Sequence, residues 1–137
     1  MGSVNSQTAD EEGSIAYDSF TSAVASLKES GRGSLMAKLD LKDAYRHIPV
    51  RSTDWNLLGF HWMGKYHYPV VLMFWGKSEP YIFNLFTEAL HWIIQKHILA
   101  RLRHYLDDFL PIFKPSMSTQ EANAAIDWIE ETATKLG

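Results

Sequence analysis

The feature that most restricts the fold is a pair of adjacent carboxylates, Asp107 and Asp108, inside the otherwise apolar segment 104–113. Neighbouring carboxylates resist burial and repel each other, so they are costly in the middle of an apolar element. Pro111 and Pro115 follow too closely for this segment to be a helix. The pattern therefore predicts a tight strand-turn-strand with the two acids at its turn.

Two interpretations of this acidic pair remain open. Asp is an ordinary turn residue, so the pair is compatible with a plain exposed turn. Alternatively, a divalent cation offsets the cost of the two charges, because hard cations prefer oxygen ligands. Asp40 ends an apolar, strand-like run, where it either caps a short helical stretch at 41–46 or adds a third carboxylate. Three carboxylates at the ends of neighbouring strands would suit a centre of two Mg²⁺ ions.

The periodicity of apolar residues predicts the remaining elements. We expect helices over 18–29, over 81–101 and from 118 to the end, a strand over 35–41, and a hairpin of 56–62 with 66–74. Gly64 lies between the two runs of the hairpin and suits its turn. This order predicts an α+β fold, in which helices pack on one face of an antiparallel sheet.

Length and composition restrict the class of protein. A chain of 137 residues predicts one domain, here 14–137, after a polar, disordered lead-in at 1–13 that opens with a Met-Gly-Ser typical of a vector remnant. Cysteine is absent, which excludes disulfides and thiolate sites. Because no apolar run reaches the length of a membrane span, we expect an intracellular protein of cytoplasm or nucleus, with no membrane partner.

The charge is unevenly distributed along the chain. The net charge is −3, yet residues 32–114 hold eleven Lys and Arg against seven Asp and Glu. Such a basic body is compatible with a phosphate backbone as a partner, and equally with an unevenly charged, solvated surface.

Three motifs in order resemble those of retroelement reverse transcriptases. The run KLDLKDAYRHIP at 38–49 resembles the first catalytic motif, and HYLDDFL at 104–110 is similar to the Tyr-x-Asp-Asp motif. Between them, LMFWGKSEP at 72–80 is similar to the Leu-Pro-Phe-Gly-x-x-Ser-x-Pro segment. The resemblance covers 32–137 and is nearest to long-terminal-repeat or tyrosine-recombinase elements of fungal type. It implies a polymerase palm with partial fingers and no thumb.

The resemblance also implies an activity and a set of site residues. The activity is RNA-directed DNA polymerisation, in which two Mg²⁺ (or Mn²⁺) ions support nucleotidyl transfer to a primer 3′-hydroxyl. The implied partners are an RNA or DNA template with its primer, and deoxynucleoside triphosphates. Asp40, Asp107 and Asp108 are the implied catalytic residues and metal ligands. The implied substrate-binding residues are Leu41 through its carbonyl, Tyr45 as a steric gate against a ribose 2′-hydroxyl, Phe74, Lys77, Tyr105 and Leu106. A ring at Tyr45 equally suits packing in the core.

Departures from the family pattern leave further hypotheses open. Trp75 stands where the family has glycine, and the thumb is missing, so we expect the chain alone to be inactive as a polymerase. The alternative is a non-catalytic, retroelement-derived module that binds nucleic acid or protein. An α+β interaction domain unrelated to the family ranks last. The chain stops where the palm would continue into another strand, and the sheet edge left open there predicts a homo-oligomer.

Overall fold

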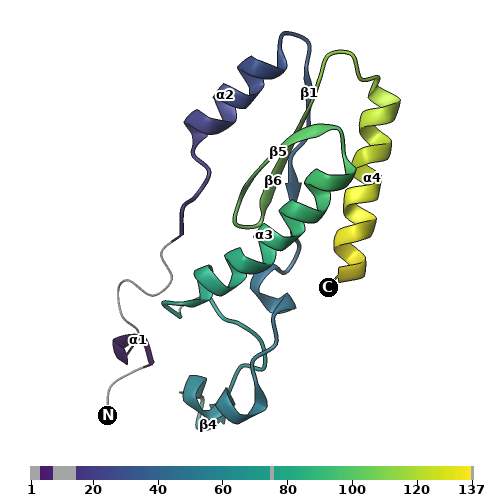
Figure 1. Cartoon of the computed structure of the whole chain (residues 1–137). Helices are drawn as coiled ribbons and strands as arrows, with labels where there is room; N and C mark the ends of the chain where they lie inside the picture. Colours follow the sequence, from purple (N-terminus) through teal and green to yellow (C-terminus); the bar gives the residue numbers. More distant parts are fainter. Residues whose placement is uncertain (1–3, 8–14, 75, 137) are drawn as a thin grey trace. The chain divides into compact units, whose positions relative to one another are not determined.

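The computed structural model describes residues 4–7, 15–74 and 76–136 (Figure 1). The chain folds as two compact units. The first contains Met1–Ile15 and Asp43–Leu85, and the second contains Ala16–Lys42 and Phe86–Gly137. Within the predicted lead-in, α1 (Val4–Gln7) forms a single helical turn, and the remaining residues of 1–13 lie outside the described residues, as does Trp75.

The second unit is built around one central strand. Its elements are α2 (Phe20–Ser30), β1 (Leu35–Met36), β2 (Leu39–Asp40), residues 86–97 of α3 (Glu79–His97), β5 (Ala100–Tyr105), β6 (Asp108–Phe113) and α4 (Thr119–Leu136). β6 pairs antiparallel with β5, and also with both β1 and β2. An antiparallel sheet combined with helices confirms the expected α+β class.

The predicted strand-turn-strand is confirmed but is longer than expected. The ladder between β5 and β6 runs from Ala100 opposite Phe113 to Tyr105 opposite Asp108. The turn between them holds Leu106 in the left-handed region, with φ of 53°. Because Ala100 already belongs to this ladder, the long helix α3 ends at His97 instead of residue 101. The predicted strand over 35–41 is likewise interrupted, as β1 and β2 with two residues between them.

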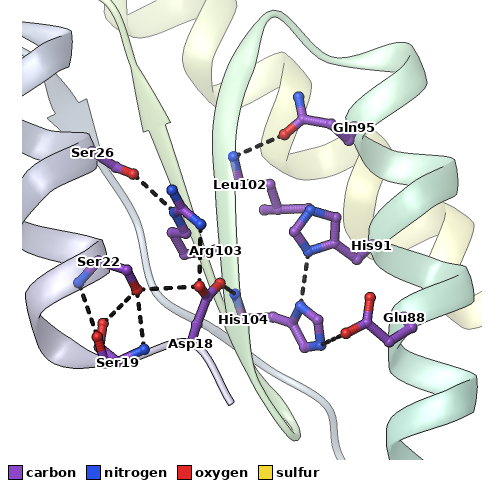
Figure 2. A network of polar contacts seen from close by, with 10 residues as sticks. All are labelled: Asp18, Ser19, Ser22, Ser26, Glu88, His91, Gln95, Leu102, Arg103 and His104. Atoms are coloured by element: carbon purple, nitrogen blue, oxygen red, sulfur yellow. Dashed lines mark hydrogen bonds and ion pairs between the residues drawn. The ribbon is translucent and has the colours of Figure 1, made fainter. Parts of the chain in front are cut away.

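The two faces of β5 contact different helices. Leu102 and His104 are buried, Leu102 in the core with α3 and His104 against His91 of that helix. Arg101 and Arg103 alternate with them and reach α2 instead. Arg101 pairs with Glu29, and Arg103 donates to Ser26, as Figure 2 shows. The expectation that all helices pack on one face is therefore wrong for α2. The physical reason is the period of two in a strand, which directs the arginine side chains away from the apolar face.

The core of the second unit lies on the apolar face. It joins α3, β5, β6 and α4 through Leu90, Ile94, Ile98, Leu102, Phe109 and Ile129. Full burial of each such side chain is worth roughly 1.5–3 kcal/mol. α4 begins as predicted, because the Ser118 hydroxyl accepts from the Glu121 N–H at 3.2 Å and the Glu121 carboxylate accepts from the Ser118 N–H at 2.8 Å. This reciprocal cap fixes the start of the helix.

The first unit holds the shorter elements. They are the 3₁₀ helices η1 (Ala44–His47) and η2 (Ser52–Leu58), the hairpin of β3 (Phe60–Trp62) and β4 (Lys65–His67), and residues 79–85 of α3. The hairpin turns at Met63 and Gly64, both with positive φ, so the predicted turn is confirmed. The predicted strands are too long. Residues 56–58 belong to η2, and residues 68–74 pair only through the bridge between Pro49 and Val71.

None of the helices within the described ranges is both long enough and apolar enough to span a membrane.

Candidate functional site

The carboxylates predicted to act together lie at one end of the sheet in the second unit. Asp40 is the last residue of β2 and stands opposite Asp108, the first residue of β6. Directly opposed residues in an antiparallel pair have Cβ atoms about 4.5–5.5 Å apart. Asp107 precedes β6 in the turn, and its carbonyl oxygen accepts a hydrogen bond from the Leu41 N–H at 3.0 Å. The expected convergence of the two segments is confirmed.

The structure also bears on the simpler interpretations of these acids. Asp40 does not cap the following helical stretch, because η1 begins at Ala44 and Asp43 occupies its N-cap position. Asp43 adopts a left-handed backbone there, with φ of 61°. Asp107 and Asp108 are partly buried, so their turn is not fully exposed.

One lysine lies among the three carboxylates. Lys38 Nζ is 3.0 Å from Asp108 Oδ1. The pKa of Lys38 is raised, first by its hydrogen bond to Asp108 and then by the negative charge of Asp108. The charges of Asp40 and Asp107 raise it further. All three acids therefore act on one cation. The pair is solvent-exposed, with 67% of the Lys38 side chain and 41% of the Asp108 side chain accessible, so its own contribution to stability is small.

The same donors suit a divalent cation in charge and chemistry. Carboxylate oxygens are the ligands that Mg²⁺ and Mn²⁺ prefer, and the Lys38 ammonium occupies the position of a stand-in cation beside Asp108. As the side chains lie, the described part of the chain contains no group of three His, Cys, Asp or Glu residues arranged to hold a metal. A metal at this end would therefore need the carboxylate side chains to turn toward it.

Tyr105, two residues before Asp107, borders a cavity. Tyr105 is half exposed, and its ring lies 4.8 Å from that of Tyr17. A cavity of about 350 Å³ opens beside Asp108 and is lined by Tyr105, Lys38 and Phe20, among others. Leu106 lies in the turn itself, where its backbone is left-handed.

Three of the implied substrate-binding residues belong to the first unit. Tyr45 is only 8% exposed and stacks on Phe83, with ring centroids 4.7 Å apart, while Phe74 lies 5.0 Å away. This environment fits the packing interpretation of Tyr45. Phe74 and Lys77 are exposed, and the Lys77 backbone N–H donates to Asn5 Oδ1.

Sequence reasoning missed a polar network that joins α2 to β5 (Figure 2). Asp18 Oδ1 accepts from Arg103 Nη1 and from the Ser22 hydroxyl, both at 3.1 Å, and Asp18 Oδ2 accepts from the backbone N–H of His104 at 3.4 Å. Arg103 Nε donates to the Ser26 hydroxyl at 2.8 Å. The alternation of arginine with Leu102 and His104 was the available signal, but the predicted helix ended at residue 101 and the predicted hairpin began at 104, with 102–103 assigned to neither.

A pair of histidines lies on the other face of β5. His91 Nδ1 and His104 Nδ1 are 2.8 Å apart, so one of them carries the proton and donates to the other. Glu88 Oε1 lies 3.8 Å from His104 Nε2. Burial lowers the pKa of both histidines, and for His91 the neighbouring His104 lowers it further. The pair is thus neutral near pH 7.

Side chains also cap the outer edge of β5. Gln95 of α3 accepts from the Leu102 N–H through Oε1 and donates to the Ala100 carbonyl through Nε2, while Asp18 accepts from the His104 N–H. Capped N–H groups do not invite another strand. Self-association through this edge would first have to displace Gln95 and Asp18, so the predicted homo-oligomer stays a prediction.

Comparison with known proteins identifies no relative: no family model matches the sequence, and no curated protein matches it.

Proposed function

We propose that the chain is the palm part of an RNA-directed DNA polymerase, whose carboxylates hold two Mg²⁺ or Mn²⁺ ions for nucleotidyl transfer. The observation that carries the proposal is the register of β2 against β6, which places Asp40 opposite Asp108 next to Asp107. Three motifs in the family order support it, and two of them meet at this end of the sheet.

The residues have separable roles in this proposal. Asp40 and Asp108 would hold the metal ions from two adjacent strands, with Asp107 contributing from the turn and the Leu41 carbonyl as a further oxygen ligand. When bound, such a metal pair lowers the pKa of the primer hydroxyl and neutralises charge on the leaving pyrophosphate. Tyr105 and Leu106 would border the primer end. Tyr45 would exclude a ribose 2′-hydroxyl, with Phe74 and Lys77 near template and nucleotide.

Binding of a deoxynucleoside triphosphate and of a primer–template tests this function. We expect Mn²⁺-dependent nucleotide binding that Asp108→Asn abolishes and that Asp127→Asn, an exposed acid on α4, leaves unchanged. Metal at ten times its Kd should also stabilise the fold by about 1.4 kcal/mol. Nucleotide binding that is unaffected by both Mn²⁺ and Asp108→Asn would contradict the proposal.

One observation favours the non-catalytic alternative. The β3–β4 hairpin exposes large aromatic side chains, including Trp62 at 64% and Tyr66 at 84%, together with Lys65. Exposed rings beside a cation are the features of a surface that stacks unpaired bases. Binding of single-stranded nucleic acid without added metal, weakened by Trp62→Ala and insensitive to Asp108→Asn, would favour this alternative.

A further inference from the structure

The position of Lys38 is set by the backbone around it. The N–H of Ala37 donates to the Pro111 carbonyl at 3.2 Å, which keeps the link between β1 and β2 against β6. Lys38 is two residues before Asp40, so the two share a face of an extended chain. Asp108 is the register partner of Asp40, and its Oδ1 accepts from the Lys38 ammonium at 3.0 Å.

The ammonium and a divalent cation would compete for the same oxygen. A metal ion binds carboxylate oxygens at about 2.0–2.2 Å, and at that distance a neighbouring ammonium adds like-charge repulsion. In the absence of metal, the charge of the ammonium is favourable. Lys38 then offsets the mutual repulsion of the carboxylates, because its ammonium lies 3.0 Å from Asp108 Oδ1 and Asp40 is the register partner of Asp108.

We propose that Lys38 is the resident counter-cation of this carboxylate cluster, holding Asp108 while no metal is bound and releasing it when a divalent cation enters. The inference rests on the proposed function. It makes Lys38 a positioning residue, which keeps the three acids together in the metal-free chain at the cost of weaker metal binding.

Titration with Mn²⁺, followed by the electron paramagnetic resonance signal of the free ion, measures this competition in the whole chain. Because an exposed ion pair is lost, Lys38→Gln should bind Mn²⁺ about two- to five-fold more tightly than the unaltered chain. Lys38→Arg keeps the charge and should bind as the unaltered chain does. Lys114→Gln removes an exposed lysine just beyond the far end of β6, which controls for net charge, and should change nothing.

A second measurement separates displacement from a general charge effect. In proton–carbon NMR spectra, added Mg²⁺ should move the Lys38 Cε–H signals toward the shifts of an unpaired lysine, while the Lys114 signals stay in place. Without metal, Lys38→Gln should melt at a lower temperature than the unaltered chain, and Mn²⁺ should raise its melting temperature by more.

The possible results distinguish this inference from the proposed function. Equal Mn²⁺ affinity of Lys38→Gln and the unaltered chain, with unmoved Lys38 signals, would overturn the role of Lys38 but leave the metal site intact. If neither the unaltered chain nor any lysine variant binds Mn²⁺, both the role of Lys38 and the proposed metal site are overturned. Equal tightening by Lys38→Gln and Lys114→Gln would reduce the effect to net charge and also overturn the inference.

Discussion

Removal of the Asp18 carboxylate should weaken the attachment of α2 to the sheet. In Asp18→Ala, Arg103 loses its ion pair, the His104 N–H loses its acceptor and the Ser22 hydroxyl loses one partner. Hydrogen bonds to a charged group contribute about 1.5–3 kcal/mol when buried. Here 25% of the Asp18 side chain and 36% of the Arg103 side chain are exposed, so solvent screening reduces that value.

The expected loss is therefore about 2 kcal/mol in the free energy of unfolding, near the low end for charged hydrogen bonds. Urea unfolding followed by circular dichroism measures it, and the m-value should stay constant if only stability changes. For a chain of this size the melting temperature should fall by about 6 °C. Asp127→Ala, on the exposed side of α4, is the matched control and should stay within about 0.5 kcal/mol of the unaltered chain.

A double-mutant cycle with Arg103→Met isolates the ion pair from the other contacts. We expect the two substitutions to be non-additive by about 1 kcal/mol, because each already removes the shared interaction. If Asp18→Ala is no less stable than Asp127→Ala, or if the two substitutions are additive, the network does not hold α2 to β5.

The remaining predictions concern pH, a helix cap and catalysis. His91 and His104 have lowered pKa values in the folded chain, so the unfolded chain takes up more protons as the pH falls through the ordinary value of 6.5. The free energy of unfolding should therefore decrease as the pH is lowered from about 7.5 to about 5. Urea unfolding should show a shallower decrease for His91→Gln, and equal slopes would refute the role of the histidine pair. Ser118→Ala should cost about 1 kcal/mol by removing the cap of α4, whereas Ser116→Ala, also exposed, should cost almost nothing in thermal unfolding. The isolated chain should show little or no primer extension, since positioning supplies much of the rate in phosphoryl transfer. Robust extension that Asp107→Asn abolishes would contradict this prediction. Any binding to a primer–template should weaken with salt.

Local chemistry explains the elements that sequence reasoning predicted well. The reciprocal cap of Ser118 and Glu121 involves neighbours in the chain, and so does the positive-φ turn at Gly64. The turn at Asp107 follows from the cost of adjacent charges in an apolar run. Such features need no partner from elsewhere in the chain, so they can be read from a short window.

The errors occurred where an apolar pattern suits both helix and strand. The run over 81–101 keeps helical spacing to its end, but residues 100–103 pair with β6, because the ladder satisfies their backbone groups. The interruption between β1 and β2 has another cause: both keep one register against β6, and Pro111 of β6, which accepts from the Ala37 N–H, has no N–H to donate in return. The side on which α2 packs depended on the partners of Arg101 and Arg103, which lie far away in the sequence.

The candidate site likewise has one part that the sequence could predict and one part that it could not. The sequence by itself determined that Asp107 and Asp108 are adjacent, because the chain links them covalently, and that an apolar hairpin presents them at a turn. Only the tertiary structure decided that Asp40 stands opposite Asp108 and that Lys38 holds that carboxylate. Both depend on the register of β2 against β6, and a slip of one residue would turn each side chain to the other face of the sheet.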